Sequence, residues 1–320
     1  MGLLVDGRWQ DRWYGADESK GRFLREQAEF RDRITRDGSS PFAAAAGRYH
    51  LYVSLACPWA HRTLIVRSLK GLQEAISVSV VDPVWGDEGW VFSENDGCTL
   101  DTINGTTRLH EVYTLARANY SGRVTVPVLW DKATRTIVNN ESSEILRMLN
   151  SEFDAWGDAS VDLCPRQHLA AIDEINAAVY ANVNNGVYRA GFATTQEAYE
   201  DAFDALFGEL DRLEARLAER RYLVGDRLTE ADVRLWTTLV RFDAVYVGHF
   251  KCNLRRIVDY PSLWAYTRDI YQHPGVAQTV RLDHIKRHYY GSHPHINPIR
   301  VVPKGPVLDF TAPHGRDALG

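Results

Sequence analysis

The sequence predicts two domains, a small α/β domain followed by a larger all-helical domain. Between residues 48 and 150, runs of strand-forming residues alternate with helix-like runs in the order β-α-β, then α, then β-β-α. From residue 165 onward the apolar residues recur at helical spacing only. The length of 320 residues suits one large domain or two ordinary ones. The 45% hydrophobic and 25% charged residues are typical of a globular protein.

Changes in composition along the chain give the domain boundaries. Residues 1–47 contain turn residues, a short amphipathic stretch and an Ala-rich segment, which favours an extension that wraps the body. Gly, Asp and Ser collect near 150–164, where we expect a linker. The expected parts are an N-terminal extension at 1–47, an α/β domain at 48–150, a helical domain at 165–289 and a C-terminal tail at 290–320.

The elements of the first domain are predicted from local sequence. Residues 48–56 alternate and are rich in strand formers, and Cys57-Pro58 then opens a helix-like run, because proline suits the first helical position. Pro127 interrupts a third strand, and a proline there marks a sheet edge or a special turn. The expected elements are strands at 48–56, 76–81, 124–130 and 134–138, helices at 59–69, 107–118 and 142–149, and a loop at 84–106.

The second domain is predicted to consist of helices alone. Thr229-Glu-Ala-Asp232 resembles a capping box, with Asp in place of the usual Glu or Gln, and marks the start of one helix. Residues 290–320 contain His, Pro and Gly without periodicity, which predicts a tail packed on the surface. The periodic runs lie at 167–185, 195–220, 229–246 and 261–272.

Composition argues against several classes of partner. The formal charge is −5, from 37 basic and 42 acidic residues, and no basic stripe is present to neutralise nucleic-acid phosphates. No apolar run approaches the roughly 20 residues that span a bilayer. The first nine residues carry charges where a signal peptide needs an apolar core, so we expect a cytoplasmic location. We expect no metal site, because the histidines near the C-terminal end, His284, His288, His293 and His295, accompany no carboxylate motif and are interpreted as surface or packing residues.

The four cysteines, Cys57, Cys98, Cys164 and Cys252, are spaced too widely for a zinc knuckle or a redox dithiol. In a reducing compartment they are expected to be free thiols. Without a C-x-x-C partner, a mixed disulfide at Cys57 must be resolved by an external thiol or a distant cysteine. This favours a monothiol mechanism with glutathione, and we interpret Cys98, Cys164 and Cys252 as non-catalytic.

The strongest candidate site is the hexapeptide Cys57-Pro58-Trp59-Ala60-His61-Arg62. A cysteine at a strand-to-helix turn lies beside unpaired backbone N–H groups, and the helix dipole there favours negative charge. Both effects lower the pKa of a thiol, and Arg62 and His61 add positive potential. The alternative is a buried structural cysteine, the usual fate of a free thiol. Pro58 argues for the functional interpretation, because it fixes the helix start.

Two further motifs fit a peptide ligand. The proline of Val126-Pro127 suggests a cis bond, and in thioredoxin-like folds the residue before this proline offers its backbone N–H and C=O to a peptide. Glu141-Ser142 stands at a predicted helix start, where Ser142 can bind a carboxylate and Glu141 can pair with an ammonium. The alternatives are a strand-edge proline and a plain N-cap provided by Asn140 or Ser142.

The succession of these motifs resembles a glutathione transferase with a catalytic cysteine, and more narrowly the glutathionyl-hydroquinone reductases, or Xi-class transferases. The resemblance implies a thioredoxin-like N-terminal domain and an all-α C-terminal domain, the glutathione-transferase fold. It covers nearly the whole chain, although segment 93–110 departs from it. The supporting strings are 49–57 (YHLYVSLAC), 121–131 (SGRVTVPVLWD), 182–188 (NVNNGVY), 228–243 (LTEADVRLWTTLVRFD), 250–252 (FKC) and 288–293 (HYYGSH).

This resemblance implies a role for particular residues. Cys57 would be the nucleophile that removes glutathione from an S-glutathionyl-hydroquinone through a Cys57–glutathione disulfide. Tyr188 and Tyr289 would bond the hydroquinone hydroxyls, and Tyr246 would help wall the aromatic pocket. Glutathione would be a co-substrate, with no metal or nucleotide, in a homodimer. The implied glutathione-binding residues are Trp90, Arg123, Val126, Glu141 and Ser142.

Three rival functions are weighed against this one. A conjugating transferase needs a Tyr or Ser to activate glutathione, and Cys57 in that place argues against it. An omega-type dehydroascorbate reductase or thiol transferase shares a catalytic cysteine, but the tail and the Tyr-rich second domain disfavour it. A non-catalytic module of the kind found in translation factors often lacks the reactive cysteine, so the presence of Cys57 disfavours that interpretation.

Overall fold

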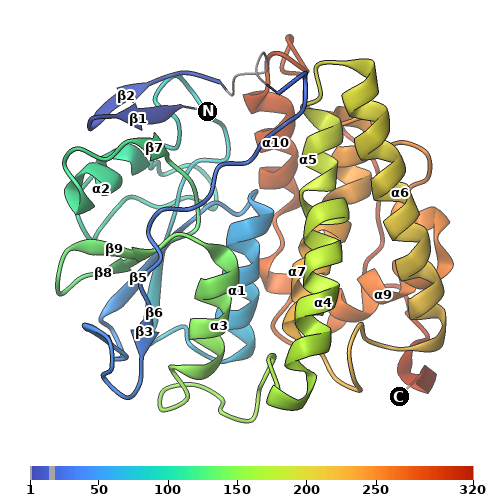
Figure 1. Cartoon of the computed structure of the whole chain (residues 1–320), viewed down its shortest axis with the longest axis horizontal. Coiled ribbons are helices and arrows are strands. Elements are labelled where there is room, and N and C mark those ends of the chain that lie inside the picture. Colours follow the sequence, from blue (N-terminus) through green and yellow to red (C-terminus); the bar gives the residue numbers. More distant parts are fainter. Residues whose placement is uncertain (1, 14–18, 320) are drawn as a thin grey trace. The chain divides into compact units, whose positions relative to one another are not determined.

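The computed structural model describes residues 2–13 and 19–319. The chain divides into two compact units, each built from segments that are distant in sequence (Figure 1). The first unit contains the expected α/β domain, and the second contains most of the expected helical domain. The first comprises Met1–Trp13, Glu26–Val161 and Asp283–Ser292, and the second comprises Tyr14–Arg25, Asp162–Leu282 and His293–Gly320.

A four-stranded sheet of order β6-β5-β8-β9 forms the centre of the first unit. Strand β5 pairs parallel with β6 and antiparallel with β8, and β8 pairs antiparallel with β9. All five residues of β5 are buried, which explains its apolar and aromatic sequence. The bounds are Tyr49–Val53 for β5, Ile76–Val80 for β6, Val128–Asp131 for β8 and Thr136–Asn139 for β9. This confirms the predicted β-α-β and β-β arrangement.

Helices α1 (Pro58–Leu69) and α3 (Ser142–Ser151) lie side by side against this sheet, and α2 (Leu109–Ala116) packs near β9 (Figure 1). Pro58 occupies the first turn of α1, as the sequence predicted. Helix α1 ends before Gly71, whose φ of +67° suits a residue without a side chain. The predicted helices of this domain are therefore confirmed.

The third predicted strand, 124–130, is divided in the structure. The Val126–Pro127 peptide is cis, as expected, and β8 begins only after the proline. Before it, β7 (Gly122–Arg123) pairs instead with β1 (Leu3–Val5) of the N-terminal extension. Strand β2 (Arg8–Gln10) completes this small sheet, in the order β2-β1-β7. The two short strands β3 (Ile34–Thr35) and β4 (Phe42–Ala43) pair parallel to each other.

Helix α10 (Leu282–Ser292) belongs to the first unit, although it follows the helical segment in sequence. The expected boundaries placed residues 282–289 in the helical domain, and no helix was predicted there. The reason lies in its buried face, which is made largely of polar and aromatic side chains. Because these do not produce an apolar repeat, periodicity misses the helix. The buried residues are His284, Ile285, His288, Tyr289, Gly291 and Ser292.

The second unit contains the four predicted helical runs. Two of them change to wider π-helical turns, at Tyr180–Asn184 and at Phe242–Tyr246, which sequence periodicity did not predict. Such turns are rare inside helices and are frequent at functional sites. The helices are α4 (Leu169–Val179), α5 (Gly186–Gly191), α6 (Gln196–Glu219), α7 (Glu230–Arg241), α8 (Val247–His249) and α9 (Pro261–Gln272). Short 3-10 turns lie at Arg166–His168, Ile257–Asp259, Ala277–Thr279 and Asp317–Leu319.

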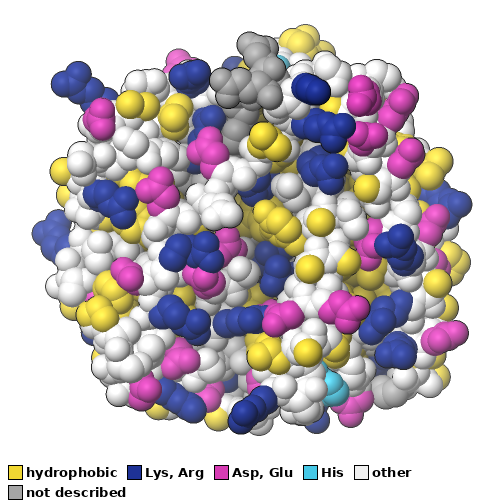
Figure 2. All heavy atoms as spheres, in the orientation of Figure 1, with side chains coloured by type: hydrophobic (Ala, Val, Ile, Leu, Met, Phe, Trp, Pro, Cys, Tyr) yellow, Lys and Arg dark blue, Asp and Glu magenta, His cyan; other side chains and the backbone are white. Residues whose placement is uncertain are grey.

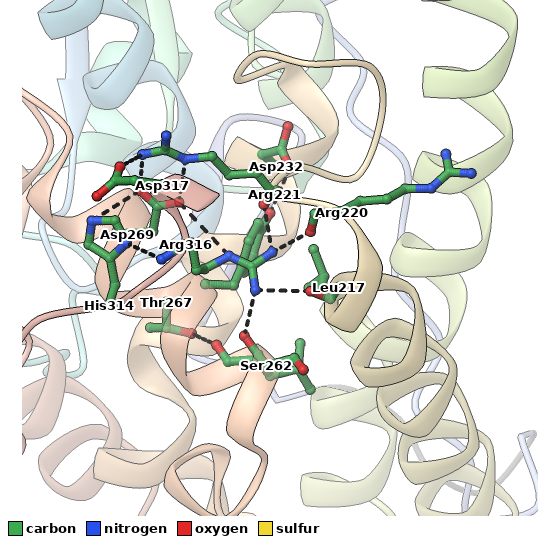
Figure 3. A network of polar contacts seen from close by, with 12 residues as sticks. Leu217, Arg220, Arg221, Asp232, Ser262, Thr267, Asp269, His314, Arg316 and Asp317 are labelled. Atoms are coloured by element: carbon green, nitrogen blue, oxygen red, sulfur yellow. Dashed lines mark hydrogen bonds and ion pairs between the residues drawn. The ribbon is translucent and has the colours of Figure 1, made fainter. Parts of the chain in front are cut away.

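Arg316 fixes the C-terminal tail to the second unit (Figure 3). Its guanidinium is 3% exposed and donates to the backbone oxygens of Leu217, at 2.9 Å, and of Arg220 and Arg221. These carbonyls lie at and just after the C-terminal end of α6, where a helix leaves its last oxygens unpaired and favours a cation. Arg221 in turn forms a two-point ion pair with Asp269, with both contacts at 2.9 Å.

Basic and acidic side chains alternate across the face drawn in Figure 2, in keeping with the near balance of 37 basic and 42 acidic residues. Among the described residues, no helix combines the length and the apolar character needed to cross a membrane.

Candidate active site

Cys57 is the N-cap residue of α1, directly after β5 and the turn that follows it. Its backbone N–H donates to the Ser54 carbonyl at 3.1 Å, and its own carbonyl accepts from His61 N at 3.0 Å. These bonds hold the residue at the helix entry, beside the N–H groups of the first turn. Cys57 is 8% exposed, so the residue is largely enclosed. This is the placement that the sequence predicted.

The loop before the cis proline contacts this sulfur. The Cys57 thiol donates to the backbone oxygen of Val126, with a sulfur–oxygen distance of 3.5 Å. Val126 itself is 4% exposed. The structure therefore brings together Cys57 and Val126, two predicted site residues that are 69 positions apart.

The start of α3 provides the third predicted motif. Glu141, not Asn140 or Ser142, is the N-cap residue, and its Oε1 accepts from Ser143 N at 2.9 Å and from Ser143 Oγ at 2.8 Å. The alternative interpretation, an N-cap at Asn140 or Ser142, is therefore wrong, because the N-cap lies one residue away at Glu141. The buried Arg62 guanidinium of α1 donates to Ser142 Oγ at 3.3 Å. A positive charge therefore adjoins this helix N-terminus, which already favours anions.

Tyr113 of α2 supports both motifs, and sequence reasoning did not identify it. Its hydroxyl donates to the Thr125 carbonyl at 2.8 Å and accepts from Thr125 N at 3.2 Å. The same hydroxyl accepts from Asn140 Nδ2 at 3.1 Å. One buried oxygen thus connects the residue before Val126 with the residue before Glu141. Burial raises the pKa of Tyr113, so the hydroxyl stays protonated as this network requires.

The structure places Arg123 among backbone groups of the N-terminal extension. Its guanidinium donates to the carbonyl oxygens of Arg12, at 2.6 Å, and Trp13, at 3.4 Å, and its Nε lies 3.2 Å from Glu26 Oε1. The side chain is 8% exposed. The extension therefore contributes to the surroundings of a predicted glutathione-binding residue, which the sequence did not predict.

Trp90 and Tyr289 are brought near each other by a histidine between them. The Trp90 ring stacks on His288, with centroids 5.0 Å apart and planes 16° apart. The His288 ring lies 5.1 Å from that of its neighbour Tyr289 and 4.6 Å from Trp85. Trp90 is 5% exposed and Tyr289 1% exposed. His288 was expected to be a surface or packing residue, and the structure buries it among these rings.

In the second unit, Tyr188 and Tyr246 belong to one aromatic cluster. Their ring centroids are 6.2 Å apart, and both rings contact Phe250, at 5.6 Å and 5.5 Å. The Arg25 guanidinium lies 4.8 Å from the Tyr188 ring centroid and donates to Asn185 Oδ1 at 2.9 Å. Both tyrosines lie at or near the end of a π-helical turn, Tyr246 as its last residue and Tyr188 four residues beyond Asn184. Tyr246 and Phe250 are completely buried and Tyr188 is 8% exposed, so the rings form a largely enclosed aromatic cluster.

The remaining cysteines have different surroundings. Cys252 is completely buried, and burial raises the pKa of its thiol, which makes the residue a poor nucleophile. Cys164 Sγ lies 3.1 Å from Glu230 Oε2, and Cys98 Sγ lies 3.9 Å from the Asp96 carbonyl. The four cysteines are thiols and not disulfides. The described residues hold no group of three His, Cys, Asp or Glu side chains suited to a metal ion.

Family models match two parts of the chain, and known proteins resemble it over nearly its full length. Residues 56–152 match the glutathione S-transferase N-terminal domain, and residues 196–269 match the C-terminal domain. The glutathionyl-hydroquinone reductase PcpF of Sphingobium chlorophenolicum is 56% identical over 307 residues, which cover 96% of this chain and 97% of PcpF. The glutathionyl-hydroquinone reductase YqjG of Escherichia coli K12 is 54% identical over 99% of both chains.

Solved structures agree with these relatives. The glutathione-bound structure of YqjG superposes with a TM-score of 0.91 at 52% identity and covers 99% of both chains. The Xi-class transferase of Natrialba magadii gives a TM-score of 0.94 at 52% identity, with 100% of this chain and 97% of that one covered. These likenesses confirm the fold and the family that the sequence motifs predicted. The chain belongs to the glutathionyl-hydroquinone reductases, the Xi class of the glutathione transferases.

Proposed function

We propose that this chain removes glutathione from S-glutathionyl-hydroquinones and yields the hydroquinone and oxidised glutathione. The observation that carries the proposal is Cys57 at the N-cap of α1, with its sulfur 3.5 Å from the Val126 carbonyl. In this position an activating Tyr or Ser of a conjugating transferase is replaced by a thiol. Identity above 50% to two relatives named glutathionyl-hydroquinone reductases, over nearly the full chain, supports the substrate class.

In the first half-reaction, the Cys57 thiolate attacks the sulfur of the bound conjugate. The new bond joins Cys57 to the glutathione sulfur, while the carbon–sulfur bond breaks and its electron pair remains on the ring carbon. That carbon gains a proton, which gives the hydroquinone. Tyr188 and Tyr289 polarise the ring oxygens and so stabilise the developing charge. Tyr246 forms part of the wall against which the ring lies.

In the second half-reaction, a second glutathione thiolate attacks the mixed disulfide at its glutathione sulfur. Oxidised glutathione leaves and the Cys57 thiolate is restored, so two glutathione sulfurs are oxidised for each ring that is reduced. Neither half-reaction uses a metal or a nucleotide. Because one product leaves before the second glutathione binds, the scheme predicts ping-pong kinetics.

We further propose how the glutathione is held. The backbone of Val126 pairs with the cysteinyl part, Trp90 packs on the tripeptide, and Glu141 and Ser142 hold the ammonium and carboxylate of the γ-glutamyl end. Support comes from the helix N-terminus and the Arg62 charge beside Ser142. Arg123 is assigned to the glycyl carboxylate, which competes with the Arg12 and Trp13 carbonyls and Glu26 for its donors.

The cellular setting is proposed on separate grounds. Four cysteines in the thiol form suit a reducing compartment, and we assign the protein to the cytoplasm. We propose a homodimer, as the family resemblance implies. Light scattering of the purified protein measures the mass directly, against 36.3 kDa for one chain.

The decisive test is turnover of glutathionyl-menadiol with glutathione by the wild type and by Cys57→Ala. We expect menadiol and oxidised glutathione in equal amounts from the wild type, and a loss of at least about a thousandfold in the variant because the nucleophile is missing. Cys98→Ala is the matched control, since that cysteine has no assigned role and should leave the rate unchanged.

Three other outcomes would change the conclusion. Full activity of Cys57→Ala would show that Cys57 is not the nucleophile. Rapid reduction of dehydroascorbate without turnover of the conjugate would favour the omega-type thiol transferase. Intersecting lines in a two-substrate plot, in place of parallel ones, would contradict the two half-reactions.

A further inference from the structure

Three polar side chains of α10 bond to the backbone of segment 83–96, which carries Trp90. His284 Nε2 lies 2.7 Å from the Asp96 carbonyl oxygen, and His288 Nδ1 lies 2.7 Å from the Pro83 carbonyl oxygen. Ser292 Oγ accepts from Trp85 N at 2.9 Å. The spacing of four residues places all three on one face of the helix. Helix α10 therefore holds both ends of the segment that carries Trp90.

The chemistry of these bonds determines where the histidine protons lie. A carbonyl oxygen only accepts, so His284 must carry its proton on Nε2 and His288 must carry one on Nδ1. His284 is completely buried, and His288 and Ser292 are 5% and 6% exposed. Bonds enclosed to this degree compete little with water, so they fix the helix and the segment to each other.

His288 has a second contact that His284 lacks. Its ring stacks on the Trp90 indole, with planes 16° apart, and meets Trp85 edge-on, with planes 87° apart. Trp85 and Trp90 also meet edge-on, with centroids 4.9 Å apart. The bond to Pro83 fixes the plane of the imidazole, and the imidazole fixes the plane of the Trp90 indole.

We propose that His288 is a positioning residue, which acts through Trp90 to set the surface on which glutathione packs. This inference rests on the proposed function, since that function assigns Trp90 to glutathione. Tyr289, the next residue, belongs to the same helical turn and contacts the His288 ring. One turn of α10 thus sets the indole for glutathione and carries the tyrosine assigned to the hydroquinone.

His288 both stacks on Trp90 and donates to Pro83, and substitutions can separate the two contacts. Phenylalanine keeps a flat ring against Trp90 but loses the bond to Pro83, whereas asparagine keeps a donor and loses the ring. If ring stacking orients Trp90, His288→Phe should keep most of the affinity for glutathione and His288→Asn should lose it. His284→Asn is the matched control, because His284 bonds the same segment from the same face without an aromatic contact among the described residues.

The experiment measures the dissociation constant of glutathione by calorimetry for the wild type and these three variants. The unfolding temperature of each protein shows whether it is folded. We expect His288→Asn to raise the constant about three- to tenfold, the loss typical of one aromatic pair, and the other two to stay within about twofold. In steady-state kinetics, His288→Asn should raise KM for glutathione and leave kcat nearly unchanged. In a Trp90→Ala background, His288→Asn should have no further effect.

Several results would overturn the inference. A folded His288→Asn with the wild-type affinity for glutathione would contradict it. So would a loss of affinity in His288→Phe or in His284→Asn that equals the loss in His288→Asn. An effect of His288→Asn that persists in full in the Trp90→Ala background would contradict it as well. His288→Gln replaces His288→Asn if the latter does not fold, since its amide also donates without stacking. A wild type that binds glutathione but does not turn over the conjugate defeats the proposed function alone, and the binding comparison still decides this inference. A wild type that does not bind glutathione defeats both.

Discussion

The Tyr113 hydroxyl makes three hydrogen bonds, and each of them reaches a segment that borders the site. In Tyr113→Phe, the Thr125 N–H and C=O and the Asn140 amide lose a buried partner. Unsatisfied buried groups cost about 1–3 kcal/mol each, and three are affected, so we expect the unfolding free energy to fall by at least about 3 kcal/mol. Val126 and Glu141 follow these residues directly, so KM for glutathione should rise severalfold. Urea unfolding and steady-state kinetics measure the two effects.

Tyr49→Phe is the control for that prediction. Tyr49 is also fully buried, and its hydroxyl donates at 2.8 Å to the carbonyl of Ala43, a residue with no proposed role in the site. It should lower stability by about 1 kcal/mol without a change in KM. A Tyr113→Phe variant with the stability loss but an unchanged KM would mean that the hydroxyl supports the fold and not the site.

Among the candidate site residues, those whose placement depends on local sequence were predictable. Cys57 next to Pro58 marks a helix start, and Val126 before Pro127 marks a special turn, because proline restricts the backbone at its own position and beside it. Tyr113 and His288 were not predictable, since each acts on residues far along the chain. Tyr113 bonds Asn140, and His288 reaches Pro83, 205 positions away. No short pattern records such a pairing.

Helix α7 depends on its first turn, and Asp232 is the residue that secures it. Its carboxylate accepts from Thr229 N at 2.8 Å and Thr229 Oγ1 at 2.9 Å, which closes the predicted capping box. It also accepts from Leu223 N at 2.8 Å and from Tyr266 Oη at 2.9 Å, and it is completely buried. Asp232→Ala removes the cap and leaves four buried donors unpaired. At about 1–3 kcal/mol for each unpaired donor, we expect the unfolding free energy to fall by at least about 4 kcal/mol.

Thr195→Ala gives the matched comparison for a helix cap. Thr195 is the N-cap of α6, and its exposed hydroxyl accepts from Ala198 N at 3.3 Å. Because water replaces that bond, the loss should be about 0.5–1 kcal/mol. Urea unfolding of both variants should therefore show Asp232→Ala to be severalfold more costly. Similar losses would mean that Asp232 acts only as an ordinary cap.

Elements with a regular apolar repeat were predicted well, and those without one were missed. Helix α6 extends from Gln196 to Glu219 where the sequence predicted 195–220, because its buried side recurs at helical spacing. Helix α10 escaped prediction because histidines and a serine occupy its buried face and bond backbone groups. The N-terminal strands β1 and β2 are only three residues each, and β1 pairs with β7, about 120 positions away along the chain.

At the scale of the whole molecule, the division into an α/β part and a helical part was predictable, but the segments that build each part were not. Composition distinguishes strand-rich from helix-rich sequence, and it placed the change near 150–164, where the first unit's long segment ends at Val161. The second unit also contains Tyr14–Arg25, and the first contains Asp283–Ser292. A chain that returns to an earlier unit does so through tertiary contacts, which composition does not record.

Acid should weaken both units, because each holds a buried neutral histidine. His50, in the first unit, is 1% exposed with Nδ1 2.7 Å from Ser77 Oγ, and burial lowers its pKa to about 4, although Asp101 opposes the shift. His249, in the second unit, is 3% exposed with Nε2 3.0 Å from His293 Nδ1. Burial, with His295 and Lys251 adding to the effect, lowers the pKa of His249 to about 4.

The direction of the effect follows from proton binding in the two states. Well above pH 6.5 both histidines are neutral whether the chain is folded or not, so they add no pH dependence. Between pH 6.5 and 4 the unfolded chain binds protons that the folded chain does not, and the unfolding free energy falls as the pH falls. Carboxylates with a lowered pKa, such as Asp131 beside Arg48, lose their contribution only at lower pH, near and below their ordinary value of 3.8.

We therefore expect the urea midpoint to fall steadily between pH 7 and pH 5, with each histidine responsible for up to about 2 kcal/mol over that interval. His50→Gln and His249→Gln should each reduce the slope, and at pH 7 each should cost stability because packing is lost. The double variant should be the least sensitive to acid. A slope equal to that of the wild type in both single variants would contradict this account and would assign the acid sensitivity to other groups.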